Sequence, residues 1–192
     1  MNGNRFIEEM KKIVLILLVL LCASCRRGGD LSTLREGDIL FIETESFQSK
    51  HIKWGMLSIW SHCGIAVDTP EGVQIMEADT TVRILPVERF IGRSVGGKYI
   101  IKRPQQQLSQ PIEKEKWLGR WYDLKFNFDN DEVYCSELVW LIYKDQGIEL
   151  CKPIKIKEHL LVRLPVLQRA LEERGISPEQ DAVAPCDLLR AL

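Results

Sequence analysis

The chain has 192 residues, with 26 basic and 27 acidic side chains and a formal net charge of −1. This length suits one domain with short appendages. With 45% hydrophobic and 28% charged residues, the composition is that of a globular protein and excludes a disordered or collagen-like chain. Because the sequence has no excess of basic charge, we expect no nucleic acid partner.

The N-terminus has the pattern of an export signal. A basic start at Met10-Lys11-Lys12 is followed by an unbroken apolar run over 13–23. This run is too short to span a membrane, which takes about 20 apolar residues, but it fits the hydrophobic part of a signal peptide. We therefore predict a signal peptide over 1–24, in which 1–9 is an upstream extension.

The apolar run ends at Cys22-Ala23-Ser24-Cys25, and small residues directly before a cysteine resemble the lipobox of bacterial lipoproteins. Cys25 would then carry the lipid, with a polar linker over 25–33 and one domain over 34–192. This pattern predicts a lipoprotein of the bacterial cell envelope, anchored on the periplasmic side or at the surface. The alternative is a signal peptide that is cleaved without lipidation.

The first half of the domain is predicted to consist mainly of strands. Pro70-Glu71-Gly72 forms a turn between the second and third of them. Helical spacing of apolar residues predicts a helix over 46–60, and a proline at its start favours a short helix over 86–91. The predicted strands are apolar runs rich in strand-forming residues, at 38–42, 63–67, 73–78, 82–85 and 99–102.

The second half changes to a helical period. Apolar residues among charges predict an amphipathic helix over 110–122, and a strongly apolar stretch predicts another over 134–143. The chain continues with a strand-like stretch at Ile154 and Ile156, a helix over 166–174 and a final helical turn over 185–189. We therefore expect an α+β fold, with an antiparallel sheet packed against helices that precede and follow it.

Cys135 lies between a polar turn at 127–131 and the predicted helix that begins there. A thiol at a helix N-terminus faces unpaired backbone N–H groups and the positive end of the helix dipole. Both favour the thiolate, moving the thiol pKa from about 8.5 toward about 3.5–7.5, and the same N–H groups can hold an oxyanion. Considered alone, such a cysteine is equally explained as a buried structural residue.

His62 opens the strand over 63–67, which would hold the ring rigidly enough for a base beside a nucleophile. Glu77 lies on the next strand, where a carboxylate among apolar residues needs a partner. Because a tight turn joins the two strands, Glu77 can lie beside His62 and set its tautomer. Asp79 shares this face by the two-residue period and is the rival for the same role. Together with Cys135, these residues suggest a Cys-His-acid hydrolase.

The chain resembles the circularly permuted papain-like enzymes related to NlpC-type cell-wall peptidases, and the bacterial YiiX group in particular, over roughly residues 37–143. The resemblance implies a permuted papain-like, NlpC-like fold. The motifs that carry it are Gly37-Asp38-Ile39-Leu40-Phe41, Gln48-Ser49-Lys50, Ser61-His62-Cys63-Gly64-Ile65, Glu77-Ala78, Tyr122-Asp123-Leu124-Lys125-Phe126 and Tyr134-Cys135-Ser136-Glu137-Leu138-Val139-Trp140.

The resemblance also implies a role for each candidate residue. Cys135 would be the nucleophile, His62 the general base and later the acid, and Glu77 the carboxylate that orients the ring. The backbone N–H of Cys135 would contribute to an oxyanion hole, with Tyr134 and Ser136 lining the site.

The chain departs from the family pattern at Cys63, where an aliphatic residue usually follows the histidine. Because side chains alternate along a strand, Cys63 should point away from the face of His62. We therefore expect Cys63 to be a core residue.

The remaining candidates suggest no metal ion and no cofactor. His51 and His159 lie on charged amphipathic stretches and are expected at the surface or its boundary. Outside the signal segment, His and Cys lack the close, repeated spacing of a zinc site, and the sequence has no phosphate-binding glycine loop. Cys151 and Cys186 can form a disulfide in an oxidising compartment, but spacing alone does not establish the bond. The five Trp residues are expected to be mostly core, with some lining an apolar groove near the site.

The leading functional interpretation is a papain-like cysteine hydrolase of the amidase type that forms a thioester on Cys135. The resemblance implies two substrate classes, namely amide bonds of cell-wall peptides and fatty-acyl amides or esters. A lipid anchor at Cys25 would place the site near a membrane. Two alternatives remain: a catalytically silent peptide- or lipid-binding lipoprotein of the same fold, and a redox-responsive lipoprotein that senses through Cys135.

Overall fold

The computed structural model describes residues 28–45, 58–159, 162 and 164–192. The predicted signal peptide, Cys25, His51 and most of the helix predicted over 46–60 lie outside the described residues. Within the described ranges, no helix is long and apolar enough to cross a membrane.

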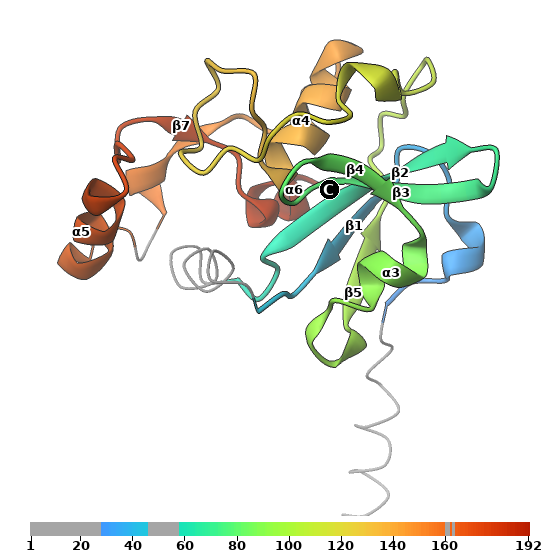
Figure 1. Cartoon of the computed structure of the whole chain (residues 1–192), viewed down its shortest axis with the longest axis horizontal. Helices are drawn as coiled ribbons and strands as arrows, with labels where there is room; N and C mark the ends of the chain where they lie inside the picture. The colour runs from blue at the N-terminus through green and yellow to red at the C-terminus, as the bar shows by residue number, and fades with distance from the viewer. Residues whose placement is uncertain (1–27, 46–57, 160–161, 163) are drawn as a thin grey trace, which may run out of the picture.

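A five-stranded antiparallel sheet forms the centre of the domain, in the order β4-β3-β2-β1-β5 (Figure 1). Its strands are β1 (Ile39–Ile42), β2 (His62–Thr69), β3 (Gly72–Ala78), β4 (Val82–Leu85) and β5 (Tyr99–Lys102). The five strands predicted for this half of the domain are thereby confirmed. His62 is the first residue of the central strand, and its pairing with Ile42 of β1 fixes the backbone of the candidate base.

Alternating side chains divide the core between the two faces of the sheet. On one face, Phe41 and Cys63 pack into a cluster with the apolar side of helix α4 (Cys135–Asp145). On the other face, Phe90 of the short helix α3 (Val87–Ile91) closes a second cluster. Figure 1 shows α4 and α3 on opposite sides of the sheet, as expected for an α+β fold.

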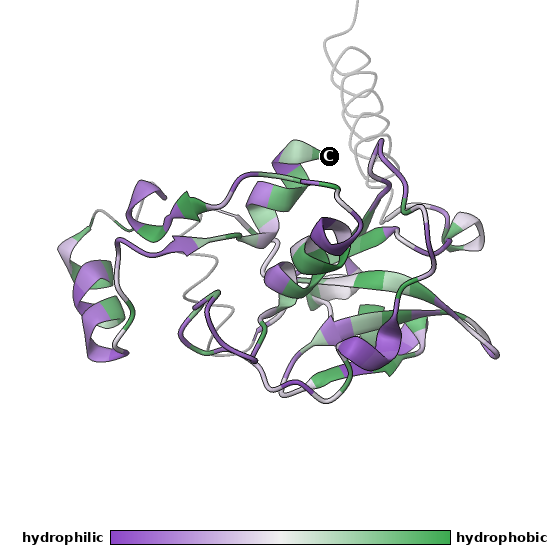
Figure 2. Ribbon diagram, turned by 90° about the horizontal axis from the view of Figure 1, so that it is seen from above, coloured by the Kyte–Doolittle hydropathy of each residue, from purple (hydrophilic) through white to green (hydrophobic). Residues whose placement is uncertain are grey.

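The C-terminal part of the chain adds a smaller unit beside the sheet. The short strands β6 (Ile154–Lys155) and β7 (Asp181–Ala182) form an antiparallel pair. Helix α5 (Pro165–Glu173) lies far from the sheet with no buried residue, whereas α6 (Pro185–Ala191) returns to contact α4 (Figure 1). Figure 2 shows the hydrophobic residues gathered along the strands and α4, where the two core clusters lie.

The prediction of a helix over 110–122 is wrong. This segment contains a single 3₁₀ turn at Lys114–Lys116 and then runs alongside β4. The N–H of Val82 donates to the Arg120 carbonyl at 2.8 Å, and the N–H of Gly119 donates to the Val82 carbonyl at 3.0 Å. Pairing with β4 thus takes the backbone groups that a helix would have used, while Trp117 is buried in the core. The strand-like stretch also ends early, because Ile156 begins a 3₁₀ turn.

Candidate active site

Cys135 is the first residue of α4, and its side chain is buried. Tyr134 before it has an extended backbone, and the Tyr134 N–H donates to Glu137 Oε2 at 3.2 Å, so the Glu137 side chain helps to fix where the helix begins. The first N–H groups of a helix have no intrahelical acceptor. The thiol therefore lies at the positive end of the helix dipole, as the sequence predicts.

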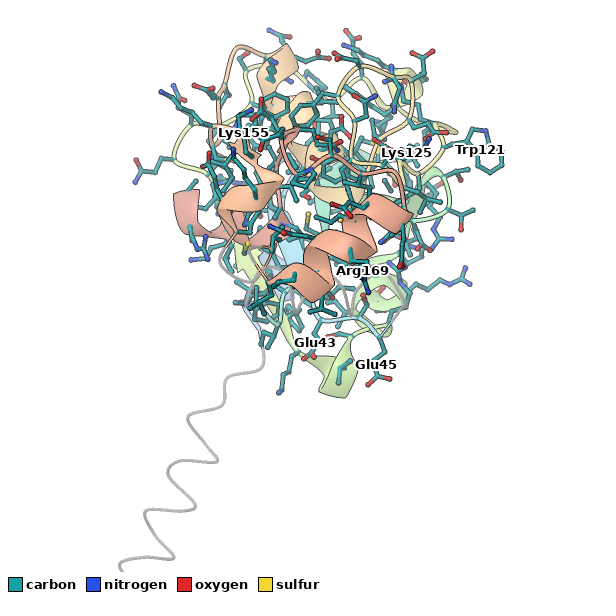
Figure 3. All side chains as sticks on the ribbon, turned by 90° about the vertical axis from the view of Figure 1, so that its left-hand side faces the viewer. Glu43, Glu45, Trp121, Lys125, Lys155 and Arg169 are labelled. Atoms are coloured by element: carbon teal, nitrogen blue, oxygen red, sulfur yellow. The ribbon has the colours of Figure 1, made fainter. Side chains whose placement is uncertain are left out.

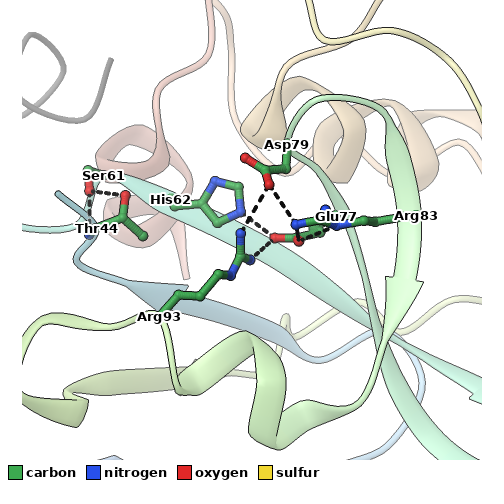
Figure 4. A network of polar contacts seen from close by, with 7 residues as sticks. All are labelled: Thr44, Ser61, His62, Glu77, Asp79, Arg83 and Arg93. Carbon is green, nitrogen blue, oxygen red and sulfur yellow. Dashed lines mark hydrogen bonds and ion pairs between the residues drawn. The ribbon is translucent and has the colours of Figure 1, made fainter. Parts of the chain in front are cut away.

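His62 is held against Glu77 by a short contact, with 2.6 Å between His62 Nε2 and Glu77 Oε2 (Figure 4). Both residues are buried. The start of the His62 strand is itself fixed, because the Thr44 N–H donates to Ser61 Oγ at 2.9 Å. Since Nε2 is engaged by the carboxylate, Nδ1 is the ring nitrogen left for a second partner.

The end of β3 and the burial of Glu77 explain why Glu77, and not Asp79, contacts His62. Ile65 pairs with Met76, so continuing the ladder places Asp79 opposite His62 and Glu77 one diagonal step away on the same face. Asp79 lies beyond the end of β3 with a half-exposed side chain, whereas Glu77 is fully buried. Both positions satisfy the two-residue period, which is why spacing alone left the choice open.

Two arginines complete a network around the Glu77 carboxylate (Figure 4). Arg83 donates to Glu77 Oε1 from Nε and Nη2, each at 3.0 Å, and Arg93 donates to Glu77 Oε2. Asp79 accepts from the same two arginines, with Asp79 Oδ2 at 2.5 Å from Arg83 Nη2. Burial opposes ionisation of Glu77, but the hydrogen bond and charge of His62 and then Arg93 outweigh it and lower the pKa of Glu77 to about 2. Glu77 is therefore a carboxylate at neutral pH.

Cys135 and His62 interact with each other in the candidate site. A hydrogen bond from Cys63, together with the charge and hydrogen bond of His62, holds the pKa of the Cys135 thiol well below its ordinary value despite burial. Burial opposes protonation of His62, but the Cys135 thiolate and Glu77 outweigh it and raise the pKa of His62 to about 9. Between these two pKa values the pair consists of a thiolate and an imidazolium.

Two residues at the thiol were not assigned a role from the sequence. Cys63 points away from the His62 face, as expected. It points to the opposite face of the sheet, which α4 covers, and therefore lies against Cys135 as well as in the core. Tyr122 also contacts the thiol, and burial followed by the Cys135 thiolate raises the pKa of Tyr122 well above its ordinary value. The sequence signal that could have identified Tyr122 as a site residue was its place in the motif Tyr122-Asp123-Leu124-Lys125-Phe126, which carries the family resemblance.

Tyr134 and Ser136, expected to line the site, direct their hydroxyl groups to the backbone of Val183. The Val183 N–H donates to Tyr134 Oη at 2.9 Å, and Ser136 Oγ donates to the Val183 carbonyl at 2.7 Å. These bonds tie the start of α4 to the segment before α6. The contribution of this helix turn to an oxyanion hole is therefore left to backbone N–H groups.

One other expectation needs correction, and two open questions are answered. His159 is buried, not at the surface, because the C-terminal segment folds back over it. Cys151 and Cys186, whose pairing the sequence left open, are free thiols in the structure. Trp121 is 63% exposed, whereas Trp117 and Trp140 are buried as expected.

The family model of the permuted papain-like amidases, the YaeF/YiiX or C92 family, matches residues 33–190. The chain belongs to this family. It is 33% identical over 161 residues to the uncharacterized protein YiiX of Escherichia coli strain K12, an alignment that covers 78% of each chain. The crystal structure of YiiX from Escherichia coli O157:H7, described as a metalloprotein, matches with 31% identity and a TM-score of 0.72, over 81% of this chain and 91% of that chain.

Membership of the permuted papain-like amidases settles the fold and indicates cysteine hydrolase activity. The order of the chain agrees with a permuted arrangement, because the strand that bears His62 precedes the helix that bears Cys135. In this family fold, the helix N-terminus supplies the thiol and the sheet supplies the imidazole and the carboxylate.

Proposed function

We propose that the chain is a membrane-anchored cysteine amidase that forms a thioester on Cys135. Its substrates would be amide bonds of cell-wall peptides, or fatty-acyl amides and esters. The observation that carries this proposal is the position of Cys135 at the start of α4 beside His62, which Glu77 orients through a 2.6 Å contact. A thiolate at pH 7 and a protonated acid beside it are what acyl transfer requires.

The reaction divides into two balanced steps. The Cys135 thiolate attacks the carbonyl carbon, the C–N or C–O bond breaks, and His62 gives its proton to the leaving amine or alcohol. Water then attacks the thioester carbonyl, His62 accepts the proton of that water, and the sulfur leaves as thiolate with release of the acid. Glu77 holds the ring in place through both steps and stabilises its charged form.

The oxyanion formed in each step would face the N-terminus of α4 and the Tyr122 hydroxyl. Because the pKa of Tyr122 is raised, this hydroxyl stays protonated and can donate a hydrogen bond. The Cys135 N–H is the second donor, and such donors act most strongly on charge that develops during reaction.

Exposed apolar side chains lie on both sides of Tyr122 in the sequence, and they support the proposal that the substrate carries an apolar group near the site. Trp121 and Leu124 are 63% and 50% exposed, and Figure 3 shows Trp121 extending outward from the surface. They suit an acyl chain or a hydrophobic peptide side chain.

The E. coli O157:H7 protein is described as a metalloprotein, so we considered a metal at the proposed active site. The residues at Cys135 do not form a group with metal-ligand spacing among the described residues, where the one such group comprises His159, Cys186 and Asp187. The proposed reaction takes its nucleophile and its acid from Cys135 and His62, so no step of it is routed through a metal.

The anchor is a proposal that rests on the lipobox-like residues before Cys25. Intact-mass analysis of protein extracted from bacterial membranes should show a mature chain that begins at Cys25 and carries a diacylglyceryl-sized adduct. A Cys25→Ser variant should lose the adduct and leave the membrane fraction. An unmodified mature N-terminus would refute the anchor without affecting the proposed chemistry.

The direct test of the proposed chemistry is to trap the acyl-enzyme. Detergent-extracted full chain is mixed with a digest of cell-wall peptides or with a panel of fatty-acyl amides and esters, then quenched in acid. We expect a mass increase on the Cys135 peptide that hydroxylamine removes, from one of the two substrate classes. Cys63→Ser should retain this adduct and Cys135→Ser should lack it.

A comparison of two tyrosine variants refines the same experiment. Tyr122→Phe should slow acylation by about 10²–10³-fold because one oxyanion donor is lost. Tyr134→Phe should lower stability instead, because the Tyr134 hydroxyl binds Val183. If neither substrate class acylates Cys135, the interpretation as a catalytically silent peptide- or lipid-binding lipoprotein replaces that of an enzyme. Reversible oxidation of Cys135 without any thioester would instead favour the redox-responsive lipoprotein.

A further inference from the structure

A second cluster of titratable side chains lies in the C-terminal part of the chain. His159, Cys186 and Asp187 each offer one ligand atom, and these three atoms lie within 4.8 Å of one another. The cluster is buried. His159 follows the 3₁₀ turn at Ile156–Glu158, whereas the other two residues belong to the first turn of α6. Because folding brings distant segments together here, no sequence spacing could have revealed the cluster.

The Nε2 atom of His159 is the observation that points to a ligand. Buried polar atoms are nearly always hydrogen-bonded, yet this atom has no hydrogen-bond partner among the described residues. The His159 side chain is 3% exposed, so bulk water does not satisfy it either. Asp187 Oδ2 lies 3.7 Å away, beyond hydrogen-bond range but suitable for two groups that share a cation.

We propose that His159, Cys186 and Asp187 bind a zinc ion. One nitrogen, one sulfur and one oxygen donor form a set that Zn²⁺ accepts, at about 2.0–2.3 Å. Two ligands of a tetrahedral ion with such bonds lie about 3.3–3.8 Å apart. The 3.7 Å between His159 Nε2 and Asp187 Oδ2 fits that range, and Cys186 Sγ lies 3.7 Å from the other carboxylate oxygen, Asp187 Oδ1. On binding, the Cys186 sulfur forms a bond to zinc and its proton passes to solvent.

The surroundings of Asp187 support this role. The Ala184 N–H donates to Asp187 Oδ2 at 2.8 Å, so the carboxylate is oriented by the backbone, as metal-binding carboxylates commonly are. Arg190 Nη1 lies 3.6 Å from Asp187 Oδ1, but its side chain is 67% exposed and can turn toward solvent. The fourth zinc position is left to water or to the thiol of Cys151, which lies within electrostatic range of Asp187 and Cys186.

The position of the site indicates a structural role. Val183, which binds the hydroxyl groups of Tyr134 and Ser136 at the start of α4, precedes Cys186 by a short stretch of chain. A zinc ion would join this stretch to His159 and so steady the segment that holds the helix of Cys135. The ion would support the reactive thiol from a distance without contacting substrate.

The test begins with the full chain extracted in detergent, stripped with a chelator and reloaded with ZnCl₂ or CoCl₂. Elemental mass spectrometry should find about one zinc per chain. The cobalt form should show thiolate-to-metal absorption in the near ultraviolet and the intense visible bands of a tetrahedral site. His159→Ala and Cys186→Ser should each lose the metal and these bands, whereas Cys135→Ser should keep both.

Each outcome decides the matter. Metal that survives in Cys186→Ser but is lost in Cys135→Ser would place the ion at the active site and overturn the proposal. A Cys151–Cys186 disulfide in the extracted protein, or a wild type that binds no more zinc than His159→Ala, would overturn it as well. If the His159→Ala and Cys186→Ser variants fail to fold, the cobalt spectrum of the wild type still shows whether a thiolate binds the metal. An unchanged spectrum in Cys135→Ser then shows that this thiolate is not Cys135. A negative result leaves the proposed amidase untouched, since thioester trapping tests that separately.

Discussion

Replacing His62 with Ala is expected to slow the alkylation of Cys135 by iodoacetamide about 100-fold at pH 6. In the wild type the thiolate is already present at this pH, because the pKa of Cys135 is held well below its ordinary value. Without the imidazolium, the thiol should titrate closer to an ordinary pKa of about 8.5, at which roughly one thiol in 300 is ionised at pH 6. Site-resolved mass spectrometry over a range of pH measures the rate at Cys135 alone.

The other cysteines provide an internal reference in the same samples. Burial raises the pKa of Cys63 well above its ordinary value and raises that of Cys151 to about 12, so their labelling should stay slow in both proteins. Equal rates at Cys135 in wild type and His62→Ala at pH 6 would contradict the pairing. Hydrolysis by the wild type should also fall as the pH rises through about 9, because His62 then loses the proton that the leaving group needs.

Replacing Glu77 with Gln should lower both activity and stability. The carboxylate is fully buried and accepts hydrogen bonds from His62, Arg83 and Arg93. Removing its charge leaves two arginines without their buried partner, which we expect to cost about 3 kcal/mol of unfolding free energy. Activity should fall by about 10²–10⁴-fold because His62 loses its orientation. Urea unfolding and steady-state kinetics measure the two effects.

Asp79→Asn is the matched control, since Asp79 contacts the same arginines from a half-exposed position. Its unfolding free energy should change by less than about 1 kcal/mol. The pH dependence separates the two further. The folded-state pKa of Glu77 is lowered to about 2 from 4.5, so its contribution is present above pH 4.5 and is lost as the pH falls through 2. That acid-side loss should be absent from Glu77→Gln, and its persistence there would refute our assignment of the network.

Local sequence patterns were sufficient for most of the secondary structure. Apolar runs rich in strand-forming residues give the strands, and the apolar stretch after the polar turn gives α4 with Cys135 at its start. They failed over 110–122, where the spacing of Trp117 and its neighbours fits a helix equally well. Backbone pairing with β4 is a non-local interaction, and it decided this segment.

The sequence by itself determined the family, and it singled out Cys135, His62 and the narrow choice between Glu77 and Asp79, because these depend on residue identity and local period. Only the tertiary structure decided which of the two contacts His62, since the end of β3 and burial distinguish two residues that alternation places on the same face. It also brought Cys63 and Tyr122 to the thiol and His159 to Cys186. These contacts join segments far apart in the chain, and their formation depends on how the helices pack against the sheet, which no local pattern encodes.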